Sequence, residues 1–142
     1  METNAPLTFE QARVEAESYA GNQGKLLALL EEADGKAKRY YEFLLAAWES
    51  LQIFLRLVRS WVEGKYRPPM SSILMVVAAL IYFVTPFDLI PDSIPVLGLV
   101  DDAAVITCVA KANLSVISSF RTWEILSSLE RRSAWKSRKK VK

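Results

Sequence analysis

The stretch that organises this chain is residues 82–102, which reads YFVTPFDLIPDSIPVLGLVDD. Its prolines interrupt regular structure, and it places four carboxylates within the most apolar part of the sequence. The four carboxylates are Asp88, Asp92, Asp101 and Asp102. Because an ionised carboxylate without a partner is costly to bury, each one needs a backbone cap, a cationic partner, a metal ion or water. We therefore look for function in this stretch.

A strongly apolar helix is predicted immediately before the prolines. From 73 to 84 every residue is apolar apart from the hydroxyl of Tyr82, so a helix over 70–85 has no polar face and belongs in a protein core or a bilayer. The strictly apolar run is shorter than the ~20 residues that span a membrane. We expect this helix to form a hairpin with a second apolar helix over 101–122, joined by the irregular aspartate- and proline-rich turn.

The second helix of the hairpin is predicted to begin at Asp101 or Asp102 and to run to about Arg131. One narrow stripe of this helix is polar and contains Thr107, Lys111, Ser115 and Ser118. Asp102 instead falls on the wide apolar face, in line with Asn113. Cys108 is the only cysteine, and its position predicts a buried free thiol.

Upstream of the hairpin, the pattern predicts two short helices and a long one. Thr8 and Gln11 have the spacing of a capping box, so a helix should run over 9–20. A second short helix is expected to end near 34–35. A third, over roughly 36–63, has apolar residues alternating at three and four positions, which is typical of a coiled-coil-like seam.

Small and cyclic residues separate the long helix from the hairpin. Gly64 can end the long helix, and Pro68 and Pro69 prevent its continuation. Ser71 or Ser72 then supplies a predicted N-cap for the apolar helix.

Composition narrows the function. At 142 residues, with 51% hydrophobic and 24% charged residues, the chain is of ordinary globular composition and single-domain length. It has no histidine, which removes the commonest general base and most zinc sites. Charge is segregated: we distinguish an acidic helical segment (1–35), a central helical domain (36–130) and a basic tail (131–142). The tail suits anionic partners such as lipid headgroups or nucleic acid, or is simply a solvated end.

The arrangement of prolines and aspartates resembles the YkvA-like family, a domain of unknown function found in small bacterial proteins. The matching residues are Gly64–Pro69, Tyr82, Pro86, Asp88, Pro91, Asp92, Pro95, Gly98, Asp101 and Asp102. The resemblance covers roughly residues 36–122. It implies an all-helical domain in a membrane setting with these aspartates as its motif, and it brings no established reaction, substrate or cofactor.

Two interpretations of the aspartates stay open. In the structural one they cap helices and turns, with Lys65, Arg67 or Lys111 neutralising one or two of them. In the functional one Asp88, Asp92, Asp101 and Asp102 form a hard-cation site for magnesium, calcium or manganese. Two neighbouring carboxylates that share a proton are a further possibility.

The sequence thus predicts an all-α, membrane-associated protein whose catalytic activity is not indicated. Lysine and arginine on both sides of the hairpin predict that both termini are cytoplasmic. The first alternative is a soluble cytoplasmic bundle that self-associates or binds a partner through an apolar face. The second is a divalent-metal-dependent enzyme that uses the aspartates, and nucleic-acid binding through the tail ranks last.

Overall fold

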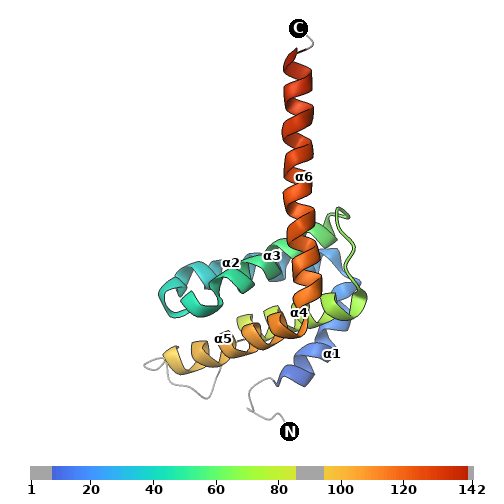
Figure 1. The fold of residues 1–142 in the computed structure, drawn as a ribbon. Helices are drawn as coiled ribbons and strands as arrows, with labels where there is room; N and C mark the ends of the chain where they lie inside the picture. The colour runs from blue at the N-terminus through green and yellow to red at the C-terminus, as the bar shows by residue number, and fades with distance from the viewer. Residues whose placement is uncertain (1–7, 86–94, 141–142) are drawn as a thin grey trace.

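The computed structural model describes residues 8–85 and 95–140. Within these ranges the chain forms six α-helices and two short 3-10 helices, and it contains no strand. The elements are α1 (Phe9–Ala20), α2 (Gln23–Arg39), η1 (Tyr41–Phe43), η2 (Leu45–Ala47), α3 (Trp48–Val62), α4 (Met70–Val84), α5 (Pro95–Ala112) and α6 (Leu114–Lys140). Figure 1 shows α1–α5 gathered in a bundle from which α6 projects. The predicted all-α bundle is confirmed.

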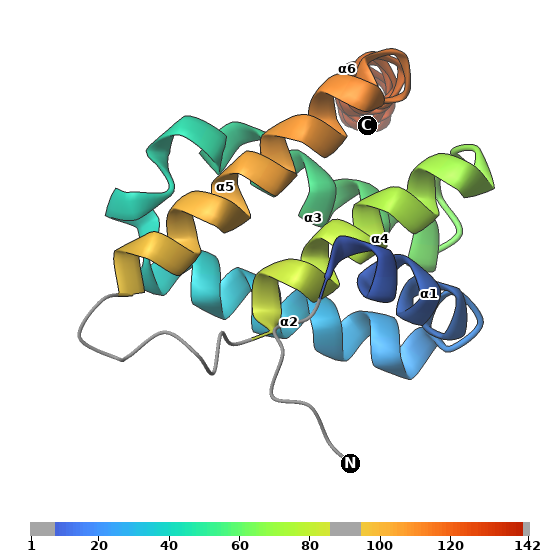
Figure 2. The ribbon, with the colours of Figure 1, turned by 90° about the horizontal axis from the view of Figure 1, so that it is seen from below.

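The apolar helix α4 lies at the centre of the bundle. It contacts α1, α2, α3 and α5, and Figure 2 shows α5 on one side of it and α1 and α2 on the other. Its buried residues are Ser72, Ile73, Val76, Val77, Ala78, Ala79, Leu80, Ile81 and Phe83. Each large aliphatic or aromatic side chain that is removed from water contributes about 1.5–3 kcal/mol to folding. A helix without a polar face is therefore accommodated here by surrounding it with other helices.

The acidic N-terminal segment shares this core. Ala12 and Ala16 of α1 and Leu30 of α2 are buried in the same apolar cluster as α4. The predicted capping box at the start of α1 is confirmed, since the Gln11 amide donates to Thr8 Oγ1 at 3.1 Å and the Thr8 amide donates to Gln11 Oε1 at 2.9 Å. α1 and α2 therefore form a helical arm that covers one side of α4.

The predicted long helix over 36–63 is wrong. α2 continues through Gly35 to Arg39, and the chain then turns through η1 and η2 before α3 begins. Leu44, one of the apolar residues at the predicted three- and four-residue spacing, is fully buried between the two 3-10 helices. Its side chain therefore fixes a turn to the core instead of extending a helix. The turn lets α3 fold back against α2.

The ends of α3 and α4 follow backbone chemistry. Gly64 has φ 74°, a left-handed conformation that glycine adopts without a Cβ penalty, and the amide of Lys65 returns to the Ser60 carbonyl at 2.9 Å. The prediction that Gly64 ends this helix is confirmed. The predicted serine N-cap of the next helix is wrong, because Pro69 is the N-cap of α4 and its carbonyl accepts the Ser72 amide at 3.1 Å.

The C-terminal region is two helices rather than one helix from Asp101 or Asp102 to Arg131. α5 begins at Pro95, where proline's fixed φ suits a first helical turn, so neither aspartate is an N-cap. α5 and α6 meet at Asn113 with a bend of 82°. The bend directs α6 away from the bundle (Figure 1).

Candidate functional site

The predicted aspartate site is only partly within the described residues. Asp88 and Asp92 lie outside them, and of Asp101 the structure describes the backbone, which is helical. Asp102 is described in full: it lies in α5 and its side chain is 1% exposed. The site is therefore built here from Asp102.

One partner of Asp102 is a lysine from the N-terminal arm. Lys36 Nζ on α2 lies 3.5 Å from Asp102 Oδ2. The same ammonium group donates to the Phe83 carbonyl at the end of α4 and lies 4.9 Å from the centre of the Phe83 ring. A single side chain thus joins α2, α4 and α5.

The chemistry of this junction explains the choice of lysine. The last carbonyls of a helix have no intrahelical partner and carry partial negative charge, so an ammonium group at Phe83 stabilises the end of α4. The same charge compensates the buried carboxylate of Asp102. The Lys36 side chain is 22% exposed, whereas that of Asp102 is 1% exposed, so the lysine lies at the edge of the bundle and the carboxylate inside it.

The geometry indicates a structural pair rather than a tight charge-assisted hydrogen bond. Optimal ammonium–carboxylate bonds measure about 2.7–2.9 Å, and this one is 3.5 Å. Removing one partner of a buried ion pair still typically costs about 3–5 kcal/mol. The Lys36–Asp102 pair therefore holds the helical arm against the α4–α5 hairpin.

Sequence reasoning missed Lys36. It named three other cations: Lys65 pairs with Glu63 at 3.3 Å, and Arg67 and Lys111 are exposed. The sequence signal that could have found it is the position of Lys36 three residues after the apolar Ala33, beside the apolar face of this helix. Choosing it would have required knowing that α2 packs beside α5.

The structure also tests the predicted burial of individual side chains along α5, and it confirms some of these predictions and contradicts others. Asp102 and Asn113 are both buried, as their shared position on the apolar face predicts. The Asn113 side-chain amide donates to the Val109 carbonyl at 2.8 Å. The predicted polar stripe is confirmed only within α5, where Lys111 is exposed and Thr107 half-buried. Ser115 and Ser118 are exposed on α6, beyond the 82° bend, so the four residues do not share one helix face. Cys108, predicted to be buried, is exposed.

Two further properties bear on metal and membrane binding. In the described ranges, no three carboxylate or thiol side chains lie close enough together to hold a metal ion. Nor does a single helix there combine the length and apolar character needed to cross a bilayer, although the bent pair α5 and α6 does so jointly. The hard-cation site at Asp88, Asp92, Asp101 and Asp102 stays a prediction.

Comparison with known proteins places this arrangement in a family. The family described as "Protein of unknown function (DUF1232)" matches residues 72–108, a range that runs from α4 into α5 and contains all four aspartates. A protein of Bacillus subtilis (strain 168) named "Uncharacterized membrane protein YkvA" is 31% identical over 102 residues, which are 71% of this chain and 96% of that protein. No solved structure matches the chain. Since the similarity extends over almost the whole of the Bacillus protein, this chain belongs to the YkvA-like family.

Proposed function

We propose that this protein is a membrane-associated helical module whose bundle attaches to the bilayer through α6. The observation that carries the proposal is the exposure of apolar side chains on α6 beyond the bundle, where Ile125, Leu126, Leu129 and Trp135 are all more than half exposed. Such a surface on one projecting helix is typical of a protein or membrane contact. The Bacillus relative is named a membrane protein, which supports the membrane.

The packing of the bundle favours attachment to the membrane surface while α4 stays surrounded by the other helices. α1, α2, α3 and α5 contact α4, so its apolar surface has protein neighbours. The Lys36–Asp102 pair fastens the covering arm. In this mode Asp102 is a structural residue, and the membrane contacts the outside of a closed bundle.

Insertion of the α4–α5 hairpin is the second candidate. The uniformly apolar composition of α4 favours it. At 15 residues and 1.5 Å per residue, however, α4 is about 22 Å long, shorter than the ~30 Å hydrocarbon core. Insertion would also separate α2 from α5 and break the Lys36–Asp102 pair. In this mode we propose that both termini remain cytoplasmic.

Fractionation of cells that express the full chain tests the proposal, with a carbonate wash of the membrane pellet. We expect the protein in the pellet and its release by carbonate, as for a surface-attached bundle. Retention after carbonate would support the inserted hairpin instead. Recovery in the soluble fraction would overturn membrane association and favour the soluble interaction module.

A pair of variants sharpens this test. Lys36→Met removes the cation that holds the arm, whereas Lys38→Met removes an exposed cation of the same helix, which pairs with Asp34 at 3.1 Å. If the hairpin inserts when the arm is released, Lys36→Met raises the carbonate-resistant fraction and Lys38→Met leaves it unchanged. Equal carbonate-resistant fractions in both variants would contradict the idea that the Lys36–Asp102 pair prevents insertion of the α4–α5 hairpin.

A further inference from the structure

The first half of α6 is fixed to the bundle. Phe120 is fully buried and forms a three-ring cluster with Tyr66 and Trp123, with ring centres 5.1–5.7 Å apart. Two ion pairs reach α3: Arg56 binds Glu124 through two contacts of 2.8 and 3.3 Å, and Arg121 lies 3.0 Å from Glu49. The direction in which α6 leaves the bundle is therefore set by packing.

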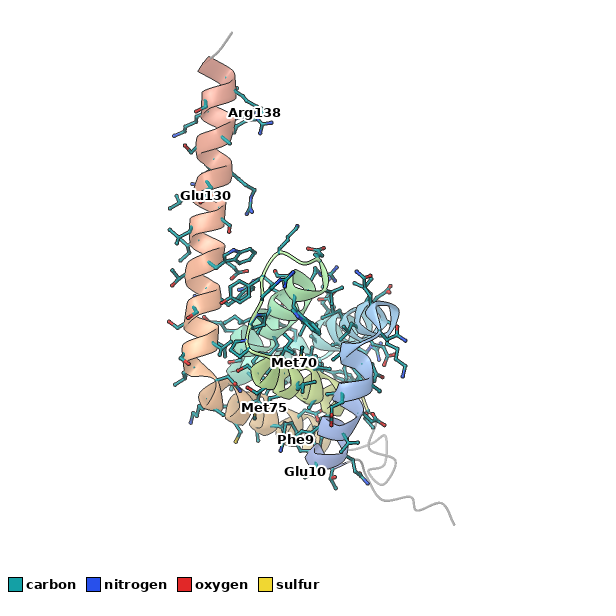
Figure 3. All side chains as sticks on the ribbon, turned by 90° about the vertical axis from the view of Figure 1, so that its right-hand side faces the viewer. Phe9, Glu10, Met70, Met75, Glu130 and Arg138 are labelled. Atoms are coloured by element: carbon teal, nitrogen blue, oxygen red, sulfur yellow. The ribbon has the colours of Figure 1, made fainter. Side chains whose placement is uncertain are left out.

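Beyond Glu124 the helix carries exposed apolar side chains. Ile125, Leu126 and Leu129 are 61%, 55% and 53% exposed. Leu129 follows Phe120 by nine positions, which at 3.6 residues per turn places it on the opposite side of the helix. Figure 3 shows this part of α6, with Glu130 and Arg138 labelled, extending past the bundle. Its outer face is thus both apolar and turned away from the core.

The same face becomes basic one turn later. Leu129 follows Ile125 by four residues, Arg132 follows Leu129 by three, and Lys136 follows Arg132 by four. The four side chains therefore share one face of the helix. Residues 131–142 contain seven lysines and arginines and no acidic residue. Trp135 is 57% exposed, with Lys139 Nζ 5.4 Å from its ring. Aliphatic anchors, a tryptophan and a cationic end are together typical of helices that lie in a membrane interface.

A second copy of α6 fits this face less well. In a parallel pair of α6 helices, Arg132 and Lys136 of one helix would lie opposite Arg132 and Lys136 of the other, and these like charges would repel. In an antiparallel pair that places Ile125 opposite Leu129, Arg132 would lie opposite Thr122 and Lys136 opposite Ser118. Neither Thr122 nor Ser118 offers a negative charge. Anionic headgroups, in contrast, complement the whole basic end.

We propose that residues 125–140 of α6 dock on a membrane surface rich in anionic lipid headgroups. Ile125, Leu126 and Leu129 enter the boundary between headgroups and acyl chains, while Arg132 and Lys136 on the same face bind headgroup phosphates, their aliphatic stems lying along the surface. Arg131 lies on another face of the helix and adds positive charge that attracts the anionic surface at longer range. This inference rests on the proposed membrane association and adds the lipid class and the contact residues.

Flotation of the purified full chain with vesicles tests it, using pure phosphatidylcholine or a mixture with phosphatidylglycerol. One variant carries Arg131→Gln, Arg132→Gln and Lys136→Gln; its charge-matched control carries Arg39→Gln, Arg59→Gln and Arg67→Gln. A second variant carries Ile125→Gln, Leu126→Gln and Leu129→Gln; its control carries Val14→Gln, Leu27→Gln and Leu45→Gln. All the control positions are exposed and lie outside α6.

We expect binding to the phosphatidylglycerol vesicles and little to phosphatidylcholine alone. Loss of three cations near an anionic surface should weaken binding on the order of 100-fold, and the apolar variant should bind at least about tenfold more weakly. Both controls should bind as the parent does. Circular dichroism of each variant verifies that it is folded.

Four results would overturn the inference. Equal binding to both vesicle types, or equal loss in variant and control, would exclude this contact while leaving membrane association in place. No vesicle binding by a chain that pellets with cell membranes would point to a membrane protein as the partner. Binding of duplex DNA through Arg131, Arg132 and Lys136 without vesicle binding would identify a nucleic-acid surface.

Discussion

Lys36 on α2 and Asp102 on α5 are 66 positions apart in the chain, and their Nζ and Oδ2 atoms lie 3.5 Å from each other at the end of α4. The two residues bring together segments that enclose the apolar helix from different sides. Asp102 lies within the range 72–108 that matches the family, so at least one residue of that range contributes to holding the bundle closed.

Breaking the Lys36–Asp102 pair should destabilise the fold asymmetrically. We expect Lys36→Met to lower the free energy of unfolding by about 3–5 kcal/mol, because the Asp102 carboxylate is left buried without this cation. Asp102→Asn should cost less, since the remaining Lys36 side chain is partly exposed and its ammonium group keeps the Phe83 carbonyl as a partner. Urea unfolding followed by circular dichroism measures both values. The control Lys38→Met should change the free energy of unfolding by less than about 1 kcal/mol. An equally small effect of Lys36→Met would contradict a stabilising role of the Lys36–Asp102 pair.

Phe120 should anchor α6 to the bundle. Phe120→Ala removes a fully buried ring and should cost about 3–5 kcal/mol. Leu129→Ala, at an exposed position of the same helix, should stay within about 0.5 kcal/mol. The same unfolding measurement compares the two. Similar costs at both positions would mean that the outer face of α6 is packed against protein in solution.

The hard-cation hypothesis for Asp88, Asp92, Asp101 and Asp102 predicts thermal stabilisation by magnesium, calcium or manganese. A cation that binds only the folded chain should raise the melting temperature by roughly 5–10 °C at a hundredfold excess over Kd. Asp92→Asn and Asp102→Asn should each abolish that rise, whereas Asp34→Asn should preserve it. Identical melting of the parent with each cation and with a chelator would exclude the site.

Tyr19 should make the stability of the folded chain depend on pH in the alkaline range. Its pKa is raised above the ordinary value of 10.0 by burial and, secondarily, by the negative charges of Glu15 and Glu32. Folding therefore favours the neutral phenol, and this contribution is complete below pH 10 and lost as the pH rises through the folded-state pKa. We expect Tyr19→Phe to lose less stability than the parent above pH 10, measured by urea unfolding at each pH. The exposed Tyr41 provides the control, and a Tyr41→Phe variant that behaves like Tyr19→Phe would contradict the assignment.

Local sequence accounts for much of the helical structure. Thr8 and Gln11 cap α1 within one turn, and Gly64 ends α3 through its own backbone freedom. The unbroken apolar run of 73–84 requires a helix surrounded by protein or lipid, and only the structure shows that protein surrounds it. These features depend on interactions between residues a few positions apart, so they can be predicted without knowing the fold. The burial of Asp102 also followed from its helical face.

Long-range packing settled the rest. Leu44 belongs to a turn rather than a helix because its burial in the core outweighs the local helical pattern. Asn113 marks a sharp bend because α6 packs through Phe120 against Tyr66. The choice of Lys36 as partner for Asp102 depends on α2 and α5 meeting at the end of α4, and no local rule connects positions 66 residues apart.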